Sequence, residues 1–155
     1  MCKERSQFMK RMFVISLILL ITLSGIVYGS GAKETGKKTI GFSVYDMQYG
    51  FFQQMEAGTK EGVLALGYDY VLHDEKSDEA LMVSGAQDLI NQGIAALIIS
   101  PHKPMALGPI VEAAHAKGIP VIVDDIGGGN SNYDVIVISD NFGGGEMAGQ
   151  YVRSE

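Results

Sequence analysis

Hydrophobic and polar positions follow one another along the chain in blocks that predict five strands separated by helices. Strands are expected at 39–45, 68–73, 95–100, 119–124 and 135–139, each a short run rich in Val, Ile, Leu or Tyr. Helices are expected at 51–66, 78–92 and 105–117, where apolar residues recur at helical spacing, and a further helix begins near 142 or 143. A glycine follows each of the first three helices as a stop signal.

The last three expected strands are apolar at nearly every position, which is typical of strands buried on both faces. Five such strands with helices between them predict an α/β fold, a three-layer, doubly wound parallel sheet. The expected strand order is 2-1-3-4-5. In a sheet of this kind, ligands bind in the loops at the carboxyl ends of the strands.

The first 31 residues have a different pattern from the rest. Four basic residues precede an apolar run at 12–23, and small residues then follow up to Ala32, which is the order of a cleavable signal peptide. The apolar run is shorter than the roughly 20 residues of a membrane span, although an uncleaved anchor over 12–28 is the alternative. We therefore divide the chain into a signal peptide at 1–31, a polar linker at 32–37 and a domain at 38–155.

Charge and cysteine content narrow the classes of partner. The chain has 12 Lys and Arg and 18 Asp and Glu; four of the basic and one of the acidic residues lie in the first 31, so the remainder carries a net charge of −9. An acidic protein repels phosphate backbones, which argues against nucleic acid. The one cysteine, Cys2, lies in the expected leader, so no disulfide or thiolate metal ligand follows it. These features favour the periplasm or cell envelope.

The expected carboxyl-end loops contain acidic, amide and aromatic side chains and few cations. They are 45–52, 100–103, 124–126 and 139–142, with Lys103 and His102 as the nearby basic residues. Sugar hydroxyls donate strong hydrogen bonds to carboxylates, and aromatic rings pack on the C–H faces of a sugar. A phosphate or carboxylate ligand would call for Arg, Lys or a helix N-terminus instead. The loops therefore favour a sugar ligand.

Four stretches, in this order and spacing, carry a resemblance to a known family. They are 39–42 with Phe51 and Phe52, 57–68, 118–122 followed by Asp125, and 139–149. Together they resemble the N-terminal lobe of the ribose-type periplasmic binding proteins, the sugar-binding components of ABC transporters. The resemblance implies one lobe of a two-lobe protein whose C-terminal lobe is missing, with a sugar captured by hinge closure. It also implies a membrane permease as partner, a monomer, no enzyme activity, no metal and no cofactor.

The resemblance also supplies the candidate site residues. Phe51 and Phe52 would include a ring that stacks on the sugar, and Asp125 would accept hydrogen bonds from its hydroxyls. Phe52 also lies on the inward stripe of its helix, so it could be a core residue, which makes Phe51 the better candidate.

Three positions depart from the ribose-binding pattern. Ile126 stands where that pattern has Arg, and Tyr49 with Gly50 replaces the usual Asn and Pro. These departures argue against ribose itself, and Asp46 and Gln48 are candidates to compensate. Asp140 completes the candidate set, with a role in the turn after the fifth strand as its alternative.

Other classes of protein fit the sequence less well. The glycine run from Gly143 to Gly149 mimics a dinucleotide fingerprint, but that motif follows the first strand of a fold and this run follows the fifth. A LacI-type regulator shares the expected fold but begins with a DNA-binding segment in place of a leader. A sensory or chemotaxis receptor of the same fold stays open. The sequence stops at residue 155 inside an expected helix, so we expect a fragment of a longer protein.

Overall fold

The computed structural model describes residues 36–154, so the expected signal peptide and most of the linker lie outside the described residues. Five strands alternate with helices. In chain order the elements are β1 (Thr39–Val44), α2 (Gly50–Ala65), β2 (Asp69–Asp74), α3 (Glu79–Asn91), β3 (Ala96–Ile99), the 3-10 turn η1 (Pro104–Ala106), α4 (Gly108–His115), β4 (Val121–Asp124), β5 (Val135–Val137) and α5 (Asn141–Ser154). Within 36–154, no helix combines the length and the apolar character that a membrane crossing requires.

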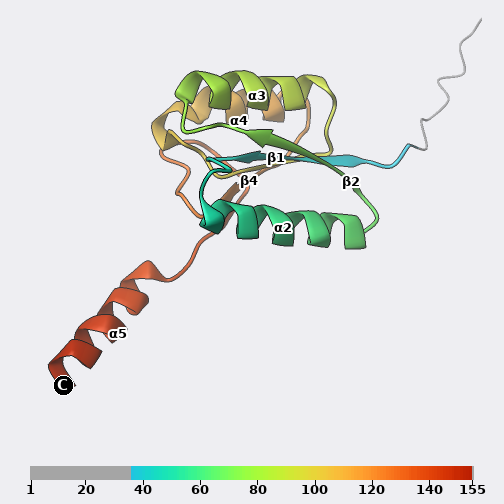
Figure 1. Cartoon of the computed structure of the whole chain (residues 1–155). Helices are drawn as coiled ribbons and strands as arrows, with labels where there is room; N and C mark the ends of the chain where they lie inside the picture. Colours follow the sequence, from blue (N-terminus) through green and yellow to red (C-terminus); the bar gives the residue numbers. More distant parts are fainter. Residues whose placement is uncertain (1–35, 155) are drawn as a thin grey trace, which may run out of the picture. The chain divides into compact units, whose positions relative to one another are not determined.

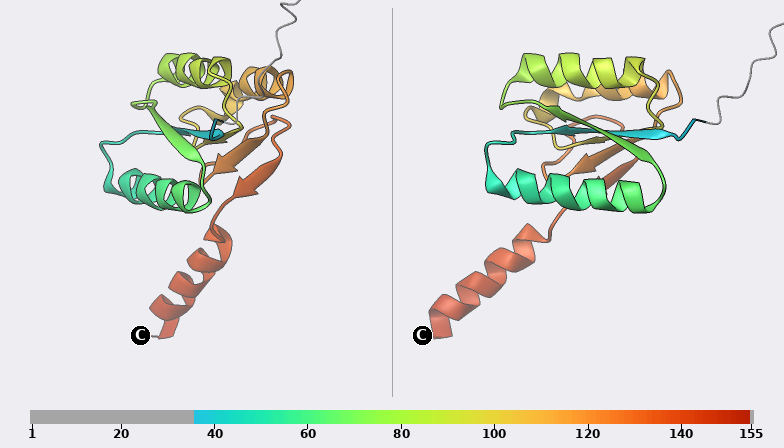
Figure 2. Two further views of the ribbon diagram at one scale, coloured as in Figure 1. Left: turned by 90° about the vertical axis from the view of Figure 1, so that its right-hand side faces the viewer. Right: turned by 45° about the vertical axis from the view of Figure 1, so that its right-hand side comes forward.

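The sheet has the predicted topology. All neighbouring strands are parallel, and their order is β2-β1-β3-β4-β5, which confirms the predicted α/β fold. Helices α3 and α4 cover one face of the sheet and α2 covers the other (Figures 1 and 2). The predicted three layers are therefore present over β1, β2 and β3.

Local sequence explains where the helices begin and end. The Asp78 side chain accepts a hydrogen bond from the Leu81 amide at 2.8 Å and so caps α3. Gly67, which follows α2, has a φ of 82°, a left-handed conformation that favours glycine. The helix expected at 105–117 is divided into η1 and α4, where Gly108 and Pro109 open a new helix.

The two faces of the sheet are packed to different depths. The α3/α4 face has 14 buried apolar residues, drawn from α3, α4, β3, β4 and the loops between them. On the α2 face, Phe42, Val44 and Phe52 are buried, and partly buried side chains such as Met55 and Ile98 surround them. Alternation along β3 separates the faces, because Leu97 and Ile99 belong to the first cluster and Ile98 to the second.

The structure contradicts the prediction that the fifth strand is buried on both faces. Ile136 packs against the α3/α4 core, but Val135 and Val137 on the opposite face are 50% and 56% exposed. The reason is that α5 does not return to cover them: none of its residues is buried, and Phe142 is 84% exposed. Figure 2 shows α5 continuing away from the end of β5. An apolar strand therefore misled the prediction, because its outer face has no helix over it.

Candidate functional site

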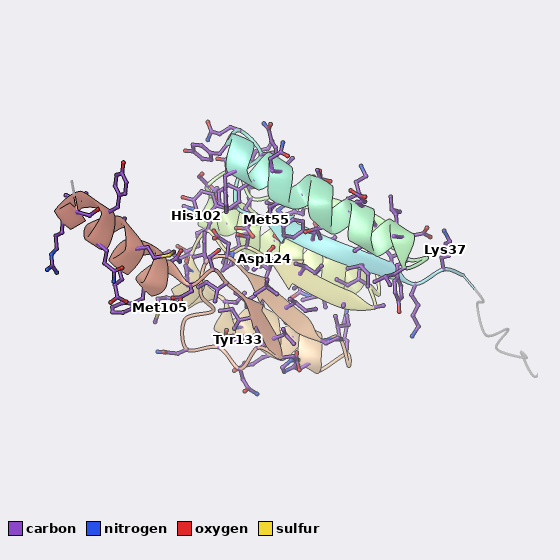
Figure 3. All side chains as sticks on the ribbon, turned by 90° about the horizontal axis from the view of Figure 1, so that it is seen from below. Lys37, Met55, His102, Met105, Asp124 and Tyr133 are labelled. Carbon is purple, nitrogen blue, oxygen red and sulfur yellow. The ribbon has the colours of Figure 1, made fainter. Side chains whose placement is uncertain are left out.

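The candidate residues lie at one edge of the sheet, in the loops that follow the carboxyl ends of the strands and in the first turn of α2. We call this edge, with the loops 45–49, 74–77, 100–103, 125–126 and 138–140, the carboxyl edge. Because β1, β3 and β4 are parallel neighbours in the order β1-β3-β4, their carboxyl ends finish on the same side. Figure 3 looks from the α2 side and labels Met55, His102 and Asp124 at this end of the molecule.

An aromatic group forms the β1 side of the carboxyl edge. The Tyr45 ring stacks on the Phe52 ring with centroids 5.0 Å apart, and Phe51 meets Phe52 edge-on at 5.1 Å. Phe52 is 9% exposed and belongs to the core, whereas Phe51 is 60% exposed. Phe51 therefore presents a ring that a ligand could cover, and Phe52 supports that ring from below.

Asp46 and Gln48 are bound to each other and to the neighbouring loop. Asp46 is buried, and its carboxylate accepts hydrogen bonds from the Ser77 hydroxyl at 2.6 Å, the Gln48 side chain at 2.6 Å and the Gln48 amide at 2.9 Å. The hydrogen bond from Ser77 is the main reason that the pKa of Asp46 lies below its usual value. These contacts make Asp46 a support of the loop after β1.

Asp125 follows β4 in an unusual backbone conformation. Its φ is 62°, in the left-handed region, and its amide donates to the Val137 carbonyl oxygen at 2.8 Å. Among the described residues, no side-chain hydrogen bond involves the Asp125 carboxylate. Burial, and then the charge of Asp125, raise the pKa of the neighbouring Asp124. The pair gives this corner of the carboxyl edge an acidic character and leaves the Asp125 oxygens available to a ligand.

Asp140 lies at the start of α5. Its carboxylate accepts a hydrogen bond from the Gly143 amide at 2.9 Å, and its carbonyl oxygen accepts one from Gly144 at 3.0 Å. This is the arrangement of a helix N-cap, so the turn role that the sequence offered as an alternative is present. The glycine run that mimics a dinucleotide fingerprint lies inside α5, where it forms no loop of the kind that cradles phosphates.

The sequence prediction missed one group at the carboxyl edge. Glu75 is fully buried, and its two carboxylate oxygens accept hydrogen bonds from the Ser43 hydroxyl and the His102 amide, each at 2.7 Å. Burial raises the pKa of Glu75 to about 7. The signal available in the sequence was Ser43, a polar residue between the apolar Phe42 and Val44. Among the described residues, no cluster of three His, Cys, Asp or Glu could hold a metal ion.

Comparison with known proteins identifies the family. Residues 40–154 match the model of the periplasmic binding protein domain. A ribose import binding protein of Bacillus subtilis is 34% identical over 117 residues, which cover 76% of this chain and 38% of that protein. A ribose import binding protein of Haemophilus influenzae is 31% identical over 147 residues, which cover 95% of this chain and 49% of that protein.

A solved structure agrees with the sequence comparison. It is the solute-binding protein of an ABC transporter from Mycobacterium smegmatis with bound glycerol, which is 32% identical with a TM-score of 0.67. The match covers 74% of this chain and 39% of that one. The chain therefore belongs to the periplasmic binding protein family, as its resemblance to ribose-type proteins predicted. It spans about half the length, or less, of the relatives it matches.

Proposed function

We propose that this chain is the N-terminal part of the substrate-binding component of a bacterial ABC-type sugar transporter, located in the periplasm or cell envelope. The observation that carries the proposal is that two suitable groups both lie at the carboxyl edge. They are the exposed aromatic ring of Phe51 and the carboxylate of Asp125, which has no side-chain hydrogen bond among the described residues. Such a ring packs on the C–H face of a sugar, and such a carboxylate accepts from its hydroxyls. Import and binding of ribose by the relatives supports the same class of ligand.

The two ligand-binding residues have different supports in the fold. Phe51 is in the first turn of α2, where its ring packs edge-on against Phe52, and Phe52 in turn stacks on Tyr45. Asp125 is fixed by its own backbone hydrogen bond to β5. We assign Asp46 and Gln48 to loop support, because the carboxylate that links them already accepts three hydrogen bonds. We assign Asp140 to capping α5.

The mechanism we propose is hinge closure over the sugar. A ligand that contacts two lobes favours the closed form by the difference in its affinity for the closed and open forms. The described residues supply one lobe with one set of contacts, so a second lobe of similar size would supply the other set. We place α5 outside this lobe, since none of its residues is buried against the sheet. A closed, loaded protein would then be recognised by a membrane permease.

The first test is a calorimetric screen of pentoses, hexoses and polyols against the full-length gene product. We expect one sugar to bind, and we expect the segment 32–155 alone to bind it more weakly than millimolar. Because Ile126 replaces the arginine of the ribose pattern, we expect ribose not to be the preferred sugar. Binding of no member of the panel by the full-length protein would contradict the proposed function.

Substitutions then test the two named residues. Asp125→Ala should weaken binding of the preferred sugar by at least threefold, about 0.7 kcal/mol, and Phe51→Ala should weaken it similarly. Asp69→Ala is the matched control, because Asp69 is an exposed carboxylate at the opposite end of β2, 3.8 Å from Lys37. A smaller effect for Asp125→Ala, or an equal effect for Asp69→Ala, would remove Asp125 from the site.

A further inference from the structure

A layer of fully buried polar side chains lies beneath the carboxyl edge. Ser43, Glu75 and Ser100 are each 0% exposed, although they adjoin loops that face solvent. Burial of a carboxylate in such a place is costly unless its oxygens accept hydrogen bonds. The Glu75 carboxylate accepts two, from the Ser43 hydroxyl and the His102 amide, and these donors come from two different strands and their loops.

The backbone of Glu75 ties it to β1 as well. Its amide donates to the Val44 carbonyl oxygen at 2.9 Å, and its own carbonyl oxygen accepts from Asp78 at 2.9 Å at the start of α3. Glu75 therefore bridges β1, the start of α3 and the loop after β3. A residue with contacts to all three is placed to set their relative positions.

The loop that carries Glu75 has a strained backbone and many contacts. Lys76 and Ser77 have φ values of 52° and 55°, which non-glycine residues rarely adopt. Ser77 donates through its amide to the Tyr45 carbonyl oxygen at 3.0 Å, and Asp74 accepts from the Met47 amide at 3.1 Å. The loop 74–77 thus supports the loop after β1 from one side, while Glu75 holds the loop after β3.

The end of this chain of contacts is the aromatic group. The His102 ring meets the Tyr45 ring edge-on with centroids 5.0 Å apart, and Tyr45 stacks on Phe52. Movement of the His102 backbone would therefore move a ring that packs against the support of Phe51. The His102 amide is held in place by Glu75.

We propose that Glu75 is a positioning residue, which fixes the loop 100–103 and, through the His102 ring, the aromatic side of the carboxyl edge. That this edge binds sugar rests on the function proposed above; the positioning itself does not. Glu75 needs no contact with the ligand for this role, because it acts through the His102 amide and the Tyr45 ring.

The chemistry of the site makes one substitution conservative and another disruptive. In Glu75→Gln the amide oxygen can still accept from the His102 amide, and the amide NH2 can donate to the Ser43 hydroxyl, which is able to accept. In Glu75→Ala both donors lose their acceptor inside the protein. Glu79→Gln is the matched control, because Glu79 is an exposed glutamate in the first turn of α3.

Hydrogen exchange followed by NMR on the full chain tests the positioning. We expect exchange of the His102 amide to quicken at least tenfold in Glu75→Ala, with altered ring contacts between His102 and Tyr45. Glu75→Gln and Glu79→Gln should keep the protection of the wild type. Unchanged protection and unchanged ring contacts in a folded Glu75→Ala protein would overturn the proposal.

If Glu75→Ala does not fold, the pH dependence of the His102 amide chemical shift in the wild type and in Glu75→Gln tests the positioning instead. An ionised carboxylate strengthens the bond from the His102 amide, whereas a neutral carboxyl or amide does not. Since the pKa of Glu75 is about 7, with Asp74 as the charged neighbour that raises it further, the His102 amide shift of the wild type should depart from that of Glu75→Gln above pH 7. At pH 5 the two should agree. A His102 amide shift that responds neither to pH nor to the Glu75→Gln substitution would show that Glu75 does not hold this amide, and would overturn the proposal.

The sugar identified in the screen provides the functional measurement. In the full-length protein, Glu75→Ala should weaken binding at least tenfold, while Glu75→Gln should stay within threefold of the wild type. Equal binding by wild type and Glu75→Ala would overturn the role of Glu75 in shaping the site. If the wild type bound no sugar, the function proposed above would fail, and the exchange experiment would still decide the positioning.

Discussion

The two faces of the sheet are made from the same strands, yet they bury different numbers of apolar side chains. The α3/α4 face is covered by two helices and contains 14 buried apolar residues, whereas four are buried on the α2 side, namely Phe42, Val44, Phe52 and Val63. None of the helices within residues 36–154 covers the α2 face past β3, and Val135 and Val137 are half exposed. Most of the burial that stabilises the described domain is therefore on one face. The other face supplies the aromatic group that we assign to ligand binding, in a region where packing is shallow.

The largest expected effect comes from one residue on the deep face and its neighbour on the shallow face. Ile99 is 0% exposed in the α3/α4 core, and Ile98 is partly buried on the α2 side. We expect Ile99→Ala to lower the free energy of unfolding by about 2 to 5 kcal/mol, since it leaves a cavity. Ile98→Ala removes the same atoms from a partly exposed site and should cost roughly 1 to 2 kcal/mol. Urea denaturation of the full chain measures both; equal losses would contradict the difference between the faces.

The next effect depends on pH and concerns the buried carboxyl below the carboxyl edge. The pKa of Glu75 is about 7 in the folded protein and 4.5 ordinarily, so the folded state holds its proton more tightly. Stability should therefore fall as pH rises from about 4.5 to about 7, by up to about 3 kcal/mol at ~1.4 kcal/mol per pKa unit. Glu75→Gln cannot ionise and should remove this fall. Urea titrations of both proteins at pH 5 and pH 8 measure it, with Glu79→Gln as control; parallel pH profiles would be the contrary result.

A smaller effect compares one glycine on each face. A Cβ at Gly85 in α3 would collide with the His73 ring, whose Nε2 donates a hydrogen bond to the Leu81 carbonyl oxygen, 2.9 Å away. A Cβ at Gly62 in α2 would meet nothing within 4 Å. Gly85→Ala should therefore destabilise the fold by about 1 to 3 kcal/mol. Gly62→Ala should stabilise it by about 0.5 to 1 kcal/mol, the helix propensity of alanine over glycine. Thermal unfolding measures both, and stabilisation by Gly85→Ala would contradict the close approach of His73.

The sequence predicted the parallel sheet because apolar runs alternate with helices that end at glycine. The usual topology of such doubly wound sheets then gave the strand order. The prediction failed at β5, since Val135 and Val137 are as apolar as a buried strand although none of the described helices covers them. Whether α5 returns to the sheet is decided by packing between distant parts of the chain, which no local pattern records.

The site was predictable in a similar, partial way. The rule that ligands bind at the carboxyl ends of strands placed Phe51 and Asp125 at the same edge of the sheet. It could not place Glu75, which reads as one more residue of a polar loop. The Glu75 carboxylate can be buried because two distant residues donate hydrogen bonds to it. These are Ser43 and His102, which are 32 and 27 residues away in the sequence. The same rule could not reveal that the Asp46 carboxylate already accepts three hydrogen bonds within the protein.

The left-handed backbone at Asp125 implies a trade-off between the stability of the fold and the binding of the sugar. A φ of 62° is adopted more readily by glycine than by aspartate, so Asp125→Gly should relieve the backbone and stabilise the fold slightly. If the carboxylate binds the sugar, the same replacement should weaken sugar binding at least threefold, as expected for Asp125→Ala. Selection for heat resistance alone would then favour glycine at this position and yield a more stable protein that binds its ligand less tightly.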